Sequence, residues 1–194
     1  MEPVFTLQWP EYLLSQELSK LFPKSKHYSV LVPASRQEKG IDLALVCKRP
    51  DSKSSVALLQ VKASRTYPRE APKRESTKRY RFGSWFNRFD PSPDADFFLL
   101  LCIYPPDPAR TKPVNAAWYR HWTLLFTLAE MRDLMSSCRT VGGTSDRMFG
   151  FGFDTGERII QTRGDQKRRH LDYTDHLLGK RVGLLASYLD RKLP

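Results

Sequence analysis

The sequence is poor in the residues and runs that define several common classes of protein. Its 194 residues include only three cysteines, Cys47, Cys102 and Cys138, without the Cys-x-x-Cys spacing of metal or redox sites. A complete disulfide framework is therefore excluded, and a cytoplasmic location is expected. No apolar run approaches the roughly 20 residues that a membrane-spanning helix needs. The beginning of the chain also lacks the pattern of a secretory signal, so no membrane partner is expected.

Motifs of other enzyme classes are missing as well. The four histidines show no His-Glu-x-x-His or other zinc-binding spacing. Gly142 and Gly143 are not followed by the Lys-Ser/Thr pair of a phosphate-binding loop. Gly150 and Gly152 alternate with aromatic residues in an expected strand, which predicts close packing or a β-bulge rather than a nucleotide loop.

Negative charge is scarce, and positive charge is concentrated in two segments. The chain has 21 acidic residues against 32 Lys and Arg, a net charge of +11, of which residues 65–88 carry +6 and residues 163–169 carry +3. Aromatic residues interleave the first segment, at Tyr67, Tyr80, Phe82, Trp85 and Phe86. This mixture is typical of phosphate neutralisation combined with base stacking, although a solvated basic loop with core aromatics would look similar.

Nucleic acid is therefore the expected partner. The basic residues expected to contact it are Arg65, Lys73, Arg74, Lys78, Arg79, Arg81, Arg88, Lys167, Arg168 and Arg169.

Hydrophobic periodicity predicts an α/β fold with a mixed β-sheet flanked by helices, in a single domain over residues 1–194. The core is expected at about residues 9–104, completed by residues 114–192. Helices are expected over residues 9–22, 128–138 and 173–191. Strands are expected over residues 27–32, 41–47, 56–63, 96–104, 122–127, 148–153 and 158–162. Residues 65–93 are expected to form a long, partly ordered excursion.

The most informative pattern is Gly40-Ile41-Asp42 followed by Leu59-Gln60-Val61-Lys62. Side chains alternate along a strand, so Gln60 and Lys62 should share one face, about 7 Å apart. A short polar turn joins the two strands, and an antiparallel hairpin would place Asp42 opposite Val61, within one residue. Asp42 is therefore expected beside Gln60 and Lys62.

These three side chains form a coherent chemical set. A carboxylate and an amide oxygen can share a hard divalent cation such as Mg²⁺ or Mn²⁺. Such a metal polarises a phosphodiester and lowers the pKa of a bound water. Lys62 could orient that water or stabilise charge that develops on the phosphate. Alternatively, the three residues have only structural roles: an Asp at a strand start, an amide on a sheet face and a Lys whose aliphatic stem covers apolar surface.

The same segment resembles the PD-(D/E)XK nuclease superfamily, in the Gln-x-Lys variant found in some restriction-type endonucleases. The order of elements is similar too: a helix, a strand, the Gly-Ile-Asp strand and the Gln-Val-Lys-Ala-Ser strand, a layout shared with archaeal Holliday-junction resolvases. The resemblance covers residues 9–104. It implies a restriction-endonuclease-like fold and metal-dependent phosphodiester hydrolysis, with Asp42 and Gln60 at the metal and Lys62 catalytic. Gln60 stands where an acidic residue is commoner, which implies weaker metal binding or loss of catalysis.

The resemblance also implies a glutamate from the first helix near the metal. On a helical wheel, Glu11 falls about 40° from the centre of the apolar stripe and Glu17 about 80° from it. Glu11 is therefore the favoured catalytic and metal-binding residue of this helix, with Glu17 as the alternative. A first-turn glutamate that complements the helix dipole is the alternative interpretation of Glu11.

The sequence thus predicts a Mg²⁺- or Mn²⁺-dependent phosphodiester hydrolase, a DNA endonuclease in the first place. One alternative is a nucleic-acid-binding module of the same fold without cleavage. Another is a basic interaction subunit of a larger complex. A homodimer is compatible with the nuclease hypothesis, because cleavage of both strands of a duplex often uses two active sites.

Overall fold

The computed structural model describes residues 9–33, 40–48, 53–68, 80–105, 119–165 and 170–192, and every structural statement below concerns these residues. The helices are α1 (Trp9–Leu21), α2 (Leu128–Ser137) and α3 (Leu178–Arg191), with 3₁₀ turns η1 (Lys24–Lys26) and η2 (Thr174–His176). The strands are β1 (Tyr28–Leu31), β2 (Leu43–Lys48), β3 (Ser54–Pro68), β4 (Phe82–Asn87), β5 (Phe97–Tyr104), β6 (Arg120–Thr127), β7 (Met148–Phe153) and β8 (Ile160–Arg163).

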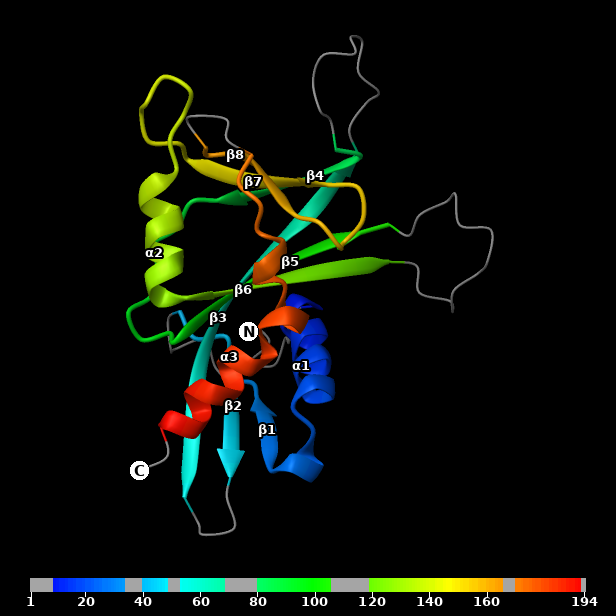
Figure 1. The fold of residues 1–194 in the computed structure, drawn as a ribbon, viewed down its shortest axis with the longest axis vertical. Helices are drawn as coiled ribbons and strands as arrows, with labels where there is room; N and C mark the ends of the chain where they lie inside the picture. The colour runs from blue at the N-terminus through cyan, green and yellow to red at the C-terminus, as the bar shows by residue number, and fades with distance from the viewer. Residues whose placement is uncertain are drawn as a thin grey trace, which may run out of the picture.

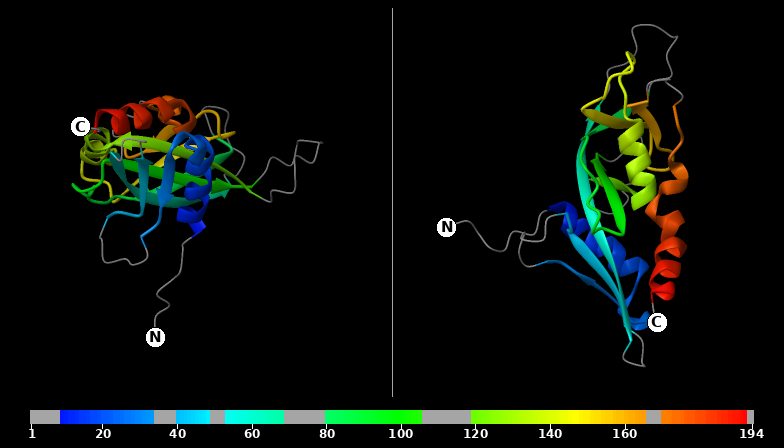
Figure 2. Two further views of the ribbon diagram at one scale, coloured as in Figure 1. Left: turned by 90° about the horizontal axis from the view of Figure 1, so that it is seen from below. Right: turned by 90° about the vertical axis from the view of Figure 1, so that its left-hand side faces the viewer.

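The strands form two sheets that share β3 (Figure 1). The first is a mixed sheet in the order β1-β2-β3-β5-β6, in which only β3 and β5 run parallel to each other. The second is antiparallel, in the order β3-β4-β7-β8. Strand β3 is 15 residues long and runs almost the full height of the molecule (Figure 2). The sequence-based prediction of an α/β fold with a mixed sheet is confirmed.

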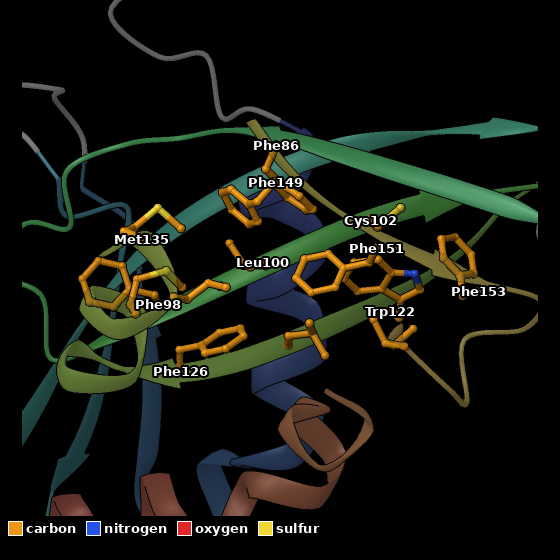
Figure 3. Packing of buried hydrophobic residues seen from close by; sticks show 14 of the residues in the cluster. Phe86, Phe98, Leu100, Cys102, Trp122, Phe126, Met135, Phe149, Phe151 and Phe153 are labelled. Carbon is orange, nitrogen blue, oxygen red and sulfur yellow. The ribbon is translucent and has the colours of Figure 1, made fainter. Parts of the chain in front are cut away.

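Two hydrophobic cores lie on opposite faces of β3 and β5. The aliphatic core joins α1 and α3 to one face of the first sheet, through Leu14, Leu59, Leu99 and Leu185 among others. Because side chains alternate along a strand, the intervening residues of β5 face the other way. They enter an aromatic core between the two sheets and α2, built from Phe86, Phe98, Leu100, Cys102, Trp122, Phe126, Met135, Phe149, Phe151 and Phe153 (Figure 3).

Three elements differ from the sequence-based prediction. Strand β3 continues to Pro68 instead of ending at Ala63, and the supposed excursion over residues 65–93 contains β4. The alternation that makes β4 a strand is visible in the chain: Phe82, Ser84 and Phe86 are buried, whereas Trp85 and Asn87 are exposed. The closing helix begins at Leu178, because η2 occupies the residues before it.

No helix in the described part of the chain is long and apolar enough to cross a membrane.

Candidate active site at a break in the sheet edge

The predicted site lies where one edge of β3 changes its neighbour. Strand β2 pairs with β3 from Ser54 to Leu59, and β4 pairs with it from Thr66 to Pro68. Strand β5 pairs with β3 from Leu59 to Arg65, so it occupies the opposite edge throughout this region. On the edge that β2 and β4 share, the stretch of β3 between them has no ladder of backbone hydrogen bonds, and the side chains of Asp42 and Ser64 form hydrogen bonds at its two ends.

Asp42 closes the end of the β2 ladder. Its backbone N–H donates to the carbonyl of Leu59 at 2.9 Å, and its Oδ2 accepts a hydrogen bond from the N–H of Val61 at 2.6 Å. Leu43 is the residue opposite Leu59, which puts Asp42 opposite Gln60 and within one residue of the expected register. Its Oδ1 has no hydrogen-bond partner within the described residues, so one carboxylate oxygen remains available to a ligand.

Gln60 faces Asp42 across the ladder and is buried, with 6% of its surface exposed. Its Oε1 accepts a long hydrogen bond from the N–H of Ser92, at 3.4 Å. Gly40 makes this packing feasible. Its φ of +86° favours glycine, and a Cβ there would lie 2.6 Å from the Cβ of Ser92. The turn before Asp42 therefore fits closely against the segment that precedes β5.

Lys62 lies on the same face of β3 as Gln60, two residues further along. Its Nζ lies 5.0 Å from the centre of the Phe89 ring, a cation–π distance. Phe89 in turn packs against Phe98, with ring centroids 6.3 Å apart. Lys62 is half-buried at the margin of the aromatic core, and no carboxylate in the described residues forms an ion pair with it.

Ser64 marks the other end of the break. Its hydroxyl donates to the carbonyl of Trp85 at 2.8 Å and its oxygen lies 3.1 Å from the N–H of Trp85. This side chain thus bonds to both backbone groups of one β4 residue. The break between Asp42 and Ser64 spans only the middle of β3, and it contains Gln60 and Lys62.

The structure separates the two candidate glutamates of α1. Glu17 Oε2 accepts a hydrogen bond from the hydroxyl of Thr123 at 2.8 Å and lies 3.3 Å from Nε2 of His121. Both partners belong to β6, three strands away from β2, so Glu17 is occupied at the far side of the sheet. Glu11 lies in the first turn of α1, with Oε2 shielded from solvent. That helix packs on the aliphatic face, opposite Gln60 and Lys62, so a metal role for Glu11 stays a prediction.

Most of the predicted nucleic-acid contacts lie outside the described residues. This applies to Lys73, Arg74, Lys78, Arg79, Lys167, Arg168, Arg169 and the side chain of Arg65. Arg81 and Arg88 are described and exposed, at the two ends of β4. Arg81 lies over the Phe82 ring, and the guanidinium of Arg88 donates to the hydroxyl of Ser145.

The aromatic residues of the basic segment divide between two roles. Phe82 and Phe86 are buried in the aromatic core, so the expectation that they stack on bases is wrong for these two. Strand alternation explains the division, because only every second residue of β4 faces outward. Trp85 is 39% exposed on the outer face.

Sequence reasoning missed the segment of residues 88–96, which supplies Phe89 and Ser92 to the site. The only available signal is positional: this segment leads directly into the buried strand that runs parallel to the Gln-x-Lys strand. Cys102, which lies opposite Ser64 on β5, is not a candidate nucleophile, because burial raises the pKa of its thiol to about 12.

Two oxygen donors at the break are of the type that a hard cation prefers. No group of three or more His, Cys, Asp or Glu side chains that could hold a metal ion occurs among the described residues. The free Oδ1 of Asp42 and the amide oxygen of Gln60, which keeps a second lone pair, are the oxygen donors at the break. Mg²⁺ usually takes one or two carboxylates and completes its shell with waters and substrate phosphates.

Comparison of the sequence with protein-family models gave no match, and comparisons with curated proteins and with solved structures gave none either.

Proposed function

We propose that the protein is a divalent-metal-dependent nuclease whose active site is the break in the β3 edge. The observation that carries the proposal is the position of Asp42, which is fixed by the N–H of Val61 directly beside Gln60 and Lys62. Residues that carry a carboxylate, an amide and an ammonium are thus neighbours on a strand edge that lacks a continuous neighbouring strand in the described residues.

Asp42 and Gln60 are the residues that would hold the metal. A bound Mg²⁺ or Mn²⁺ would supply Lewis-acid polarisation of the scissile phosphate and a more acidic water. The hydrogen bond from Val61 orients the Asp42 carboxylate, since a ligand fixed through its second oxygen loses less freedom on binding. The contact between Gln60 and Ser92 holds the amide in the same way.

Lys62 would supply the positive charge. Its ammonium has no carboxylate partner among the described residues, so it can pair with a phosphate without first breaking an ion pair. The Phe89 ring holds the end of the side chain in place without neutralising it. Lys62 would then stabilise the charge that develops on the phosphate oxygens.

The decisive experiment is a nicking assay on supercoiled plasmid with Mg²⁺, Mn²⁺ or EDTA, repeated on single-stranded RNA. Lys62→Ala should lower metal-dependent cleavage at least about 100-fold, since removal of one donor that stabilises charge in a transition state typically costs about 10²–10³ in rate. Lys48→Ala is the matched control, since Lys48 is an exposed lysine at the far end of β2. Equal cleavage by the wild type and Lys62→Ala would assign the activity to another site or to a contaminating nuclease.

Gln60→Glu sharpens the test. The substitution restores a charged ligand of the same size, so activity should be kept or raised if Gln60 binds the metal. A purely structural Gln60 predicts no gain, because the new carboxylate would be buried beside Asp42 with a like charge.

A nucleic-acid-binding module without cleavage is the second candidate function. Its support is that the described residues place a single carboxylate at the break, together with the hydrogen bond that Gln60 already makes to Ser92. DNA binding that is unaffected by EDTA, with no cleavage by the wild type or by Gln60→Glu, would favour this alternative.

A further inference from the structure

A hairpin over residues 138–146 connects α2 to β7 and projects past the end of that helix, as the yellow loop above α2 in Figure 1. In it, Arg139 forms an antiparallel bridge with Ser145. The N–H of Thr140 donates to the carbonyl of Thr144 at 2.8 Å, and the hydroxyl oxygens of the same two threonines lie 2.7 Å apart. These bonds fix the backbone of the hairpin and the directions in which its side chains leave it.

Three exposed arginines, called the arginine cluster below, belong to this hairpin or are bonded to it. Arg139 lies in its first arm, and Arg147 directly follows its second. Arg88, at the end of β4, donates its N–H to the carbonyl of Arg147 at 2.8 Å, and its guanidinium donates to the hydroxyl of Ser145. The end of β4 and the hairpin therefore form one surface, although 57 positions separate Arg88 from Ser145 in the chain.

The positive charge of the arginine cluster is not neutralised within the described residues. No carboxylate among them forms an ion pair with any of the three arginines. Asp146 is the one acidic residue of segment 138–147, but it is buried and paired with Arg163 at 3.1 Å. Hydrogen bonds from Arg163 hold the pKa of Asp146 below its usual value. Asp165, opposite Cys138 at the base of the hairpin, has its Oδ2 shielded from solvent.

The arginine cluster adjoins the candidate active site through the end of β4. Arg88 directly precedes Phe89, whose ring lies 5.0 Å from Nζ of Lys62. Thr66 is paired with Ser84, and continuing this antiparallel register brings Arg88 opposite Lys62. Because side chains alternate along a strand, positions 62 and 66 share a face with positions 84 and 88. The arginine cluster therefore borders the face of the sheet that carries Lys62.

The chemistry of the arginine cluster favours phosphate over a protein partner. A guanidinium stays charged and presents several N–H donors in one plane, which suits phosphate oxygens, and threonine hydroxyls are common additional phosphate donors. Segment 138–147 contains no aromatic residue, and its exposed apolar side chain is Val141, at 65% exposure. A protein interface usually has a larger apolar centre. Without a ring to stack on bases, the arginine cluster would contact the backbone of a nucleic acid irrespective of its sequence.

We propose that the arginine cluster binds the phosphate backbone of nucleic acid beside the candidate active site. The ligand chemistry is a row of phosphodiesters, which a duplex and a single strand both supply. This inference deepens the proposed nuclease function and rests on it for its biological meaning, but binding can be measured separately from cleavage.

The test is fluorescence anisotropy in EDTA at a series of NaCl concentrations, with a fluorescein-labelled duplex of 20 base pairs and a labelled oligo(dT) of 20 nucleotides as probes. The double variant Arg139→Gln/Arg147→Gln removes two exposed charges and keeps the backbone bond between Arg88 and Arg147. The slope of log affinity against log salt should flatten by about 1.8 for the duplex, at about 0.9 per phosphate contact, and by about 1.4 for the single strand.

Lys48→Gln/Arg191→Gln is the matched control. It removes the same net charge from exposed positions at the far end of β2 and at the end of α3. The control should change the slope by less than about 0.5, because these positions would contact no phosphate. Equal flattening by the two double variants would reduce the effect to net charge and overturn the proposal, as would an unchanged slope in the cluster variant. Labelled poly-L-glutamate that binds the wild type more tightly than the duplex does, and loses affinity for the cluster variant, would assign the surface to an acidic protein partner.

Two further variants protect the test against a failure to fold. Arg147→Gln alone should flatten the duplex slope by about 0.9. Arg139→Lys/Arg147→Lys keeps both charges and should keep the wild-type slope, because counterion release follows charge. A slope that flattens in the lysine variant as much as in the glutamine variant would contradict a phosphate contact. Because all these measurements are made in EDTA, an absence of cleavage would count against the nuclease proposal and not against the arginine cluster.

Discussion

Two aspartates flank β3 on its opposite edges and do similar work for the backbone. Asp42 Oδ2 accepts from the N–H of Val61 at 2.6 Å, and Asp96 Oδ2 accepts from the N–H of Leu58 at 2.8 Å. Each also donates its own N–H to a carbonyl of β3. Both carboxylates therefore extend the ladder of β3 at the point where a neighbouring strand begins.

Their other oxygens differ. Asp96 Oδ1 accepts a hydrogen bond from the hydroxyl of Tyr188 and lies 3.1 Å from Nζ of Lys192, at the end of α3. Within the described residues, Asp42 Oδ1 has no such partners. The two carboxylates therefore have the same backbone role but differ in the partners of Oδ1. In Asp96 this oxygen bonds to residues of the α3 end, whereas in Asp42 it can still accept a bond from a ligand.

The largest expected effect is on the rate of cleavage, where Asp42 matters more than Asp96. Asp42→Asn should reduce metal-dependent cleavage at least about 100-fold, because it removes the one charged donor that the described residues place at the break. Asp96→Asn should leave the cleavage rate within about threefold of the wild type. The comparison requires initial rates of plasmid nicking as a function of Mg²⁺ concentration. It would fail if both variants lost activity to the same extent.

The second expected effect is on stability, where Asp96 matters more than Asp42. Asp96→Asn should lower the free energy of unfolding by about 1–3 kcal/mol, because it removes charge-assisted hydrogen bonds to Tyr188 and Lys192. Asp42→Asn should cost less than about 1 kcal/mol, since an amide oxygen can still accept from Val61. Urea unfolding followed by circular dichroism measures both values. Asp94→Asn, at an exposed position on the same segment, is the control.

A third carboxylate, that of Glu130, stabilises the fold through its charge, so its contribution depends on pH. Burial would raise the pKa of Glu130, but hydrogen bonds from Arg181 and Thr127 outweigh it and lower the pKa from 4.5 to about 2. The folded-state pKa is below the unfolded one, so this stabilisation is present above pH 4.5 and is lost as the pH falls towards 2. The side chain is 35% exposed, so solvent screening limits the contribution to about 1 kcal/mol.

Glu130→Gln should therefore destabilise the protein near neutral pH and have progressively less effect below pH 4.5. Urea unfolding of the wild type and the variant from pH 7 to pH 3 measures this difference. A difference that stays constant with pH would show that packing of the side chain, and not its charge, accounts for the contribution of Glu130.

Local pattern was enough to predict the hairpin that carries the site. The short turn between β2 and β3 fixed the register to within one residue, because an antiparallel ladder propagates from its turn. The faces of Gln60 and Lys62 followed from strand alternation alone. The α2 helix is also of the kind that sequence predicts well, since Thr127 and Glu130 form a capping box at its start.

Contacts between distant segments could not be predicted in this way. Phe89 and Ser92 reach Lys62 and Gln60 across about 30 residues of chain, and no local periodicity encodes that meeting. The position of Glu17 was decided by Thr123, more than 100 residues away. Strand β4 was missed for another reason: its basic flanks and its Gly83 and Trp85 masked the alternation that buries Phe82, Ser84 and Phe86.

The position of α3 bears on how the chain folds during its synthesis. This last helix supplies Leu178, Leu185 and Leu189 to the core that also encloses Leu14 and Leu18 of the first helix. A nascent chain cannot bury α1 against this full set of neighbours until α3 has left the ribosome. Long-range contacts of this kind slow folding and leave apolar surface exposed in the meantime. A ribosome that stalls before Leu178 would therefore present a chain with an open aliphatic core to chaperones and proteases.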